Sequence, residues 1–121
     1  MGLILSTWTP NTATDASYSV IAGSYEHAAA NGYTAGGDTV AATFATSAGT
    51  LTFDVADNVW TADGGSIVAR YALLYNSSAG GTNDLIAYAL LDNSPADVTA
   101  TDTNTLIVTI HATGAYTSAQ A

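Results

Sequence analysis

The sequence contains no cysteine and no lysine, and its only cationic residue apart from two histidines is Arg70. Without cysteine, the chain can form neither disulfides nor thiolate metal sites. Ten acidic residues against one arginine give a formal net charge of −9. Binding to nucleic acid requires several cations that displace counterions from the phosphates, and attraction to anionic lipid requires them too. We therefore expect neither a nucleic-acid partner nor a membrane partner.

Long apolar runs are also missing. No run approaches the roughly 18 residues of a membrane helix. Residues 1–5 are apolar but lack the basic start and the length of a signal peptide, so we expect synthesis in a cytoplasm without export by the general secretory route. The length of 121 residues predicts a single domain.

Charged residues make up only 9% of the chain, against about 25% in ordinary domains. In their place the sequence has 19 threonines, which favour β structure and predict a neutral, hydroxyl-coated exterior. The 24 alanines offer little apolar area each, so the core is expected to be thin for a domain of this size. Docking onto another surface, or onto copies of the same chain, would supply the missing burial.

Alternation of apolar and polar residues predicts strands at 39–45 and 50–55. The sequence YALLYNS at 71–77 returns as YALLDNS at 88–94, and the intervening residues 78–83 are rich in turn formers. This pattern predicts a central antiparallel hairpin. Because both of its strands are nearly apolar, we expect them to be covered on both faces, with Leu73, Leu74, Leu90 and Leu91 inside the fold or an oligomer interface.

The remaining segments complete an all-β prediction. Residues 17–24 are expected to form a short strand, 26–30 one helical turn, 32–37 a glycine-rich turn, 93–102 a loop and 105–112 the last clear strand. Strands at intervals near ten residues predict an antiparallel β-sandwich, of which a jelly roll is one form. The expected domain spans 1–121, with 1–17 as an N-terminal arm and 113–121 as a polar C-terminal tail.

A catalytic or metal-binding constellation does not emerge. His27 and His111 lie far apart in the sequence, although Glu26 beside His27 could form part of a proton carrier. No Gly-x-Ser-x-Gly motif nominates a nucleophile. Asp57 and Asp63 do not match a calcium loop and are better explained as caps of turns. We expect a protein that is not an enzyme and that has no metal or cofactor.

Two features could contact a partner. The early apolar residues either form an edge strand that completes the sheet or belong to an arm that reaches another molecule, with a tryptophan as its anchor. Arg70 stands in an apolar strand, where it either pairs with a carboxylate of the chain or meets an acidic patch on a partner. The candidate interface residues are Leu3, Ile4, Leu5, Trp8 and Arg70.

Four segments together resemble a family of small structural proteins of tailed bacteriophages. In chain order they read GYTAGG at 32–37, TFDVADNVW at 52–60, ARYALLY at 69–75 and LIAY at 85–88. Members of the family often read GYTAGG, FDADDVTW, ARYAVLY and PLIAYVD. The sequence departs from this pattern at Asn58, where Asp is common, and at Asn83-Asp84, which replaces a proline-containing lead-in.

The resemblance implies a virion structural protein, made in the bacterial host cytoplasm and displayed on the outer capsid surface. The leading hypothesis is a capsid cement or decoration protein whose partners are the major capsid protein and itself, as a homo-oligomer such as a dimer or trimer. A head-fibre or tail component is the alternative within the virion. A glycan-binding β-sandwich is a more distant alternative, with Trp8, Tyr25, Tyr33 or Tyr116 as stacking platforms.

Overall fold

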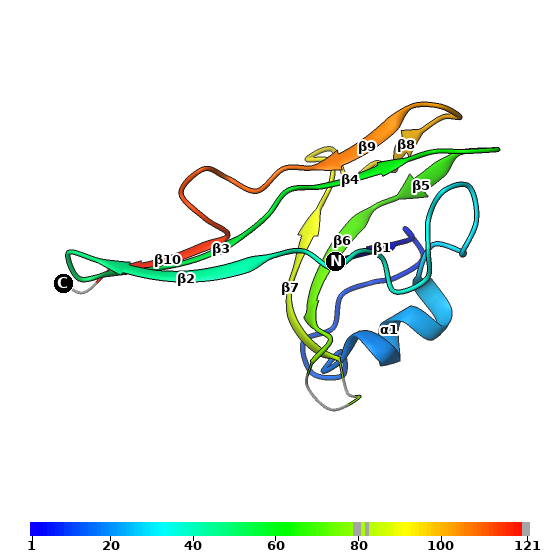
Figure 1. The fold of residues 1–121 in the computed structure, drawn as a ribbon. Coiled ribbons are helices and arrows are strands. Elements are labelled where there is room, and N and C mark those ends of the chain that lie inside the picture. Colours follow the sequence, from blue (N-terminus) through cyan, green and yellow to red (C-terminus); the bar gives the residue numbers. More distant parts are fainter. Residues whose placement is uncertain (79–80, 82, 120–121) are drawn as a thin grey trace.

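The structure, a computed structural model, describes residues 1–78, 81 and 83–119 (Figure 1). Within them, strands dominate and one short helix is present. The elements in chain order are β1 (Gly2–Ile4), α1 (Tyr18–Tyr25), β2 (Ala42–Ser47), β3 (Thr50–Val55), β4 (Asn58–Thr61), β5 (Ile67–Ala69), β6 (Tyr71–Asn76), β7 (Asp84–Leu90), β8 (Val98–Ala100), β9 (Thr105–Val108) and β10 (Tyr116–Ala119).

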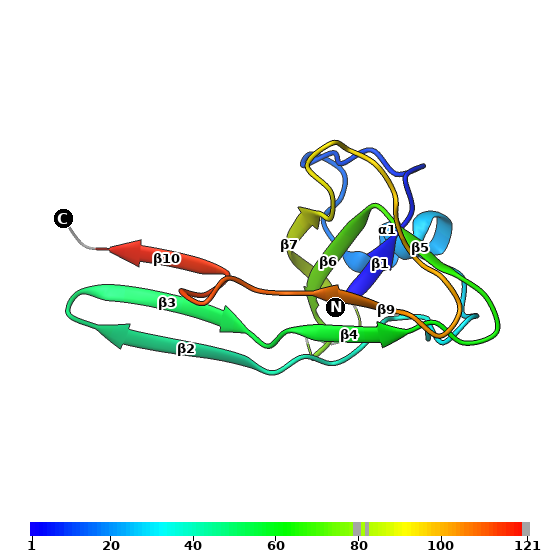
Figure 2. The ribbon, with the colours of Figure 1, turned by 90° about the horizontal axis from the view of Figure 1, so that it is seen from above.

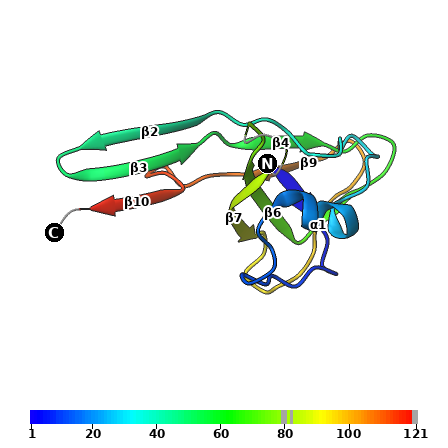
Figure 3. The same ribbon diagram turned by 90° about the horizontal axis from the view of Figure 1, so that it is seen from below.

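The strands form four small antiparallel sheets, which confirms the predicted all-β, sandwich-like class. Their strand orders are β1-β6-β7, β5-β8, β4-β9 and β10-β3-β2. The first three sheets and α1 make up a compact part, which we call the body. The fourth sheet projects away from the body as an arm, as the views from above and below show (Figures 2 and 3).

The β6 strand lies at the centre of the body and separates two clusters of buried side chains. Leu73 is fully buried in one cluster, with residues of β1 and α1 and with Trp8. Its neighbours Ala72 and Leu74 point the other way, toward the larger cluster formed with β4, β5, β8 and β9. The predicted coverage of both faces is therefore confirmed for β6.

The same prediction is wrong for β7, which pairs with β6 but lies at the edge of its sheet. Most of its residues are exposed, and Leu90 retains 39% of its surface. Leu91, just after β7, packs partly buried against the larger cluster. The hairpin itself is confirmed by the pairing of Tyr71 with Leu90 and of Leu73 with Tyr88. The connecting turn predicted at 78–83 lies partly outside the described residues.

The segment predicted as a strand at 17–24 is instead the helix α1, and no helical element is found at 26–30. Two buried residues three positions apart, Tyr18 and Ile21, place one face of α1 against the β1-β6-β7 sheet. The ring of Tyr18 stacks on Tyr75 of β6 at a centroid distance of 3.9 Å. Tertiary burial of this face outweighs a local sequence whose glycine and β-branched valine are weak helix formers.

Other boundaries also differ from the sequence predictions. The expected polar tail at 113–121 contains β10, which pairs with β3, while residues 120–121 lie outside the described part. The expected loop at 93–102 contains β8, which pairs with β5. The strand expected at 105–112 ends at Val108, and the one expected at 39–45 begins at Ala42. The strand at 50–55 is confirmed with its predicted bounds.

Burial of tyrosines makes the stability of the body sensitive to alkali. The hydroxyl of Tyr18 has no hydrogen-bond partner among the described residues, and burial raises the pKa of Tyr18 far above its ordinary value of 10.0. In the folded state Tyr18 therefore stays neutral, whereas in the unfolded chain it ionises above about pH 10. Its contribution is fully present below pH 10 and is lost as the pH rises further.

We expect Tyr18→Phe to reduce this alkaline loss. Near neutral pH the substitution should leave stability unchanged or slightly raised, because it removes a buried hydroxyl that lacks a partner. At pH 11 the variant should retain about 1.4 kcal/mol that the parent loses. Urea unfolding at pH 8, 10 and 11 measures both effects, with the 60%-exposed Tyr116 changed to Phe as control. Equal alkaline losses in Tyr18→Phe and the parent would contradict the prediction.

Candidate interaction surface

The arm consists of β2, β3 and β10, and β3 is its central strand. It extends away from the body, so that neither the body nor another described segment covers most of it (Figure 2). Every residue of β2 and β10 is exposed. The arm is therefore the part of the fold that the chain itself leaves most open to a partner.

The register of the arm places its apolar side chains on one face. Phe53 is paired with Phe44 on one side and with Tyr116 on the other, which gives an aromatic row across all three strands. The rings of Phe44 and Phe53 lie 4.7 Å apart. Leu51 is two residues from Phe53 and so belongs to the same face. We call this surface, made of Phe44, Leu51, Phe53 and Tyr116, the aromatic face.

The opposite face of the arm is polar. Thr52 and its neighbours Ala45 and Thr117 form one row there, and Thr43 with Asp54 forms another. A sheet with one apolar and one hydroxyl-rich face is typical of a sheet whose apolar face packs against a second layer. Here the aromatic face is largely bare, since Phe44 retains 73% and Tyr116 60% of their surface.

The aromatic face forms one wall of a groove where the arm meets the body. The groove has a volume of about 800 Å³. The opposite wall comes from the β6–β7 hairpin through Leu74 and Ile86, and the base from the segment 36–40. Ile86 is half-exposed, so apolar side chains face the opening from both walls.

Hydrogen bonds fix the angle at which the arm leaves the body. The Ile110 amide donates to Asp57 Oδ1 at 2.7 Å, and the Ala56 amide donates to the Ala41 carbonyl at 2.9 Å. The Asn58 side-chain amide donates to Asp38 Oδ2 at 2.9 Å. These bonds hold the two strands that enter the arm to the returning strand, so the groove is a built feature. The prediction that Asp57 caps its own turn is wrong, because its carboxylate accepts from the distant Ile110 amide. At the turn of Asp63, the Gly64 amide donates to Asp102 Oδ1 instead.

The predicted N-terminal docking arm is wrong. Leu3 and Ile4 are 0% exposed in β1, which is the edge strand of its sheet, and Leu5 is half-buried. Trp8 is buried edge-on against Tyr71 and Tyr88, and its indole N–H donates to Asp15 Oδ2 at 3.1 Å. Of the two alternatives for these early apolar residues, the edge strand is therefore confirmed: they complete the sheet.

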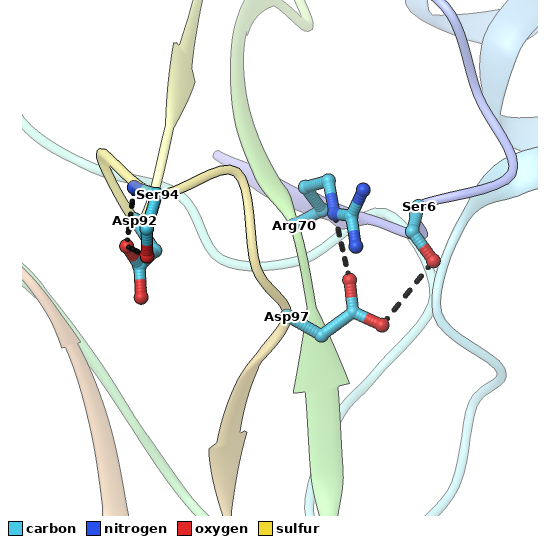
Figure 4. Close-up of polar contacts among 5 residues, drawn as sticks. All are labelled: Ser6, Arg70, Asp92, Ser94 and Asp97. Carbon is cyan, nitrogen blue, oxygen red and sulfur yellow. Dashed lines mark hydrogen bonds and ion pairs between the residues drawn. The ribbon is translucent and has the colours of Figure 1, made fainter.

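Arg70 forms an ion pair within the chain (Figure 4). Its Nε lies 2.8 Å from Asp97 Oδ1, and Ser6 donates to the other oxygen of this carboxylate at 3.2 Å. The side chains of Arg70 and Asp97 are 27% and 36% exposed, so water screens the pair, which contributes about 1 kcal/mol at most. In a turn nearby, hydrogen bonds from the Ser94 hydroxyl and amide lower the pKa of Asp92.

The two histidines and Glu26 each contact other residues of the chain. His27 is buried, with Nδ1 2.7 Å from the Ala28 carbonyl and its ring against Tyr33. Glu26 accepts hydrogen bonds from the Tyr33 hydroxyl and the Gly36 amide, which ties the glycine-rich turn to the body. His111 contacts Thr113 on the surface. In the described part of the chain, no three His, Cys, Asp or Glu side chains converge as a metal site.

The predictions from the sequence do not include the aromatic face, although the sequence contains a signal for it. The alternation that predicted strands at 39–45 and 50–55 also places Phe44, Leu51 and Phe53 on one side. Alternation shows which residues share a face but not whether the chain covers that face. The third member of the row, Tyr116, lies in the segment expected to be a polar tail.

Comparisons with known proteins identify no similar protein. No protein-family model, curated protein or solved structure matches this chain. Among residues 1–78, 81 and 83–119, no helix is long and apolar enough to span a membrane.

Proposed function

We propose that this chain is a structural protein of a tailed-bacteriophage virion: a cement or decoration protein that binds the outer capsid surface and stabilises the shell. The observation that carries the proposal is the bare aromatic face on a projecting arm. A monomer that works alone rarely leaves a contiguous apolar patch of this kind in water, because such patches mark sites of association. The order of phage-like motifs along the sequence supports the virion as the place of association.

Charge supports an apolar mode of contact. The single arginine is already paired with Asp97, so no free cationic patch is available for an acidic partner within the described residues. Contacts to the major capsid protein would therefore be made mainly by apolar side chains and main-chain groups. Such contacts change little with salt, because few ion pairs are present to be screened.

Stabilisation of a shell follows from mass action. A protein that binds the assembled shell and not its separated subunits shifts the equilibrium toward the shell, in proportion to the binding free energy. A hydroxyl-rich exterior with a net charge of −9 suits a protein displayed in many copies, because repulsion between like charges limits unwanted association between particles. No catalytic step is needed for this role.

The two alternative functions have unequal support. A projecting arm also suits a head fibre or a tail component, so this remains the second candidate within the virion. The glycan-binding alternative loses support, because Trp8 and Tyr33, two of its four aromatic platforms, are buried in the body. Tyr116 is exposed but belongs to the aromatic face.

Co-sedimentation with undecorated shells tests the proposal. We expect the purified protein to pellet with shells in saturable fashion, to do so equally across a salt series, and to raise the temperature at which the shells disrupt. Duplex DNA serves as the control ligand and should not bind, because the chain has one cation. Binding to isolated tails or fibres but not to shells would favour the second candidate. Binding to no part of the virion would overturn the proposal.

A further inference from the structure

We infer that the aromatic face is covered by the arm of a second copy of this chain, so that the protein assembles into a homo-oligomer through its arms. This inference deepens the proposed function, on which its biological role rests, by naming the surface and the partner of self-association. Three independent observations carry it: the area of the chain, the placement of its charges and the geometry of the arm.

The first observation is an excess of surface. A compact monomer of 12.2 kDa exposes about 6,100 Å², whereas this chain exposes 6921 Å². The excess of about 800 Å² equals the share that one partner contributes to a standard-size protein interface. Projection of the arm from the body accounts for this excess, because the arm buries few of its residues (Figure 3). A second copy that covers the aromatic face would therefore return the chain to an ordinary exposed area.

The second observation is that the arm is nearly free of charge. Two copies that each carry −9 repel one another wherever their carboxylates approach. Among the strand residues of the arm, Asp54 is the only charged one, and it belongs to the polar face. One of its oxygens accepts a hydrogen bond from the Val55 amide. The four residues of the aromatic face carry no charge, and Asp38 at the base of the groove already accepts a hydrogen bond from the Asn58 side chain. Two like-charged copies can therefore meet on this face with little repulsion.

The third observation is that the arm is self-complementary. A two-fold axis would set the aromatic row of one arm against the same row of the other, at the spacing of about 10 Å that separates packed sheets. Aromatic rings then interdigitate in the groove between the arm and the β6–β7 hairpin. The edge strands β2 and β10 contain no proline and no charge, which are the features that proteins use to block edge association. The edges of the arm therefore carry no proline and no charge that would hinder the close approach of a second arm.

Sedimentation velocity and light scattering on the full chain test the inference. We expect the parent protein to be oligomeric and Phe44→Asp to weaken its association at least about thirty-fold, because it replaces the most exposed ring of the aromatic row by a carboxylate. The matched control is Ile107→Asp in β9, where a 56%-exposed apolar side chain lies on the body, away from the arm. This control should leave association unchanged. Phe44→Thr, which keeps a good strand former, should weaken association while preserving the fold, as circular dichroism can verify.

Each outcome decides the question. A parent chain that is monomeric at all soluble concentrations overturns the inference, as does an oligomer that persists in both folded Phe44 variants. The inference is also overturned if native mass spectrometry detects only a monomer that carries a bound small molecule. The shell assay separates the two proposals: shell binding by a monomeric parent refutes only the inference, whereas an oligomer that binds no shell refutes only the proposed function.

Discussion

Leu73→Ala is expected to lower the free energy of unfolding by about 2–5 kcal/mol. Leu73 is 0% exposed and lies under α1, with Ile4, Trp8, Tyr18 and Ile21 around it. Truncation removes most of the side chain and leaves a cavity that stacked aromatic rings and a paired β1 strand cannot easily fill. A thin core makes this loss a large fraction of the total stability. Equilibrium unfolding in urea, followed by tryptophan fluorescence and circular dichroism, measures the change.

Leu90→Ala is the matched control for this prediction. Leu90 lies on β7, the strand paired with β6, but 39% of its surface is exposed. The same chemical change should therefore cost less than about 1 kcal/mol, since much of the side chain already contacts water. Equal losses at the two positions would show that β7 is covered in the folded state and that its exposure is assigned wrongly.

Gly32→Ala is expected to cost at least about 3 kcal/mol. Gly32 has a φ of +86°, a region that costs an L-residue about 1–2 kcal/mol. A Cβ at this position would overlap the carbonyl oxygen of Thr61, which is a backbone atom at the end of β4. Relief of the overlap requires the turn to move away from β4. That movement would break the hydrogen bond from the Asp63 amide to the Asn31 carbonyl.

Gly64→Ala separates the two contributions. Gly64 has a φ of +74°, close to that of Gly32, but no atom lies within 4 Å of the place its Cβ would occupy. This variant should lose only the backbone term, about 1–2 kcal/mol. Thermal melts of both variants give the comparison. A loss at Gly32 no larger than that at Gly64 would mean that the turn at 32–37 is not held against β4.

Strands are predictable from the sequence where their pattern is regular. The strict alternation at Thr50–Val55 predicts the observed bounds of β3, and two apolar runs around a turn predict the β6–β7 hairpin. In both cases the signal is local, because side-chain direction in a strand follows residue parity. The sequence does not predict β8 and β10, because three or four residues with threonine and serine carry no such pattern.

Features that depend on distant contacts were not predictable in this way. The helix α1 exists because Tyr18 meets Tyr75, a residue 57 positions later in the chain. Trp8 is buried because two tyrosines of the β6–β7 hairpin pack against its ring. Arg70 could be expected to pair with a carboxylate, but only the fold selects Asp97 among ten acidic residues. The candidate surface was hidden for a related reason, since alternation cannot reveal what covers a face.

The position of Arg70 also determines where a protease specific for basic residues can cleave the chain. An enzyme that cuts only after lysine or arginine has one target bond, between β5 and β6. The Arg70 amide donates to the Ile4 carbonyl and its carbonyl accepts from the Leu91 amide, both at 2.9 Å, so cleavage requires neighbouring strands to separate first. The rate of tryptic cleavage would then report how often the body opens. The arm, although it is the most exposed part of the fold, gives such an enzyme nothing to cut.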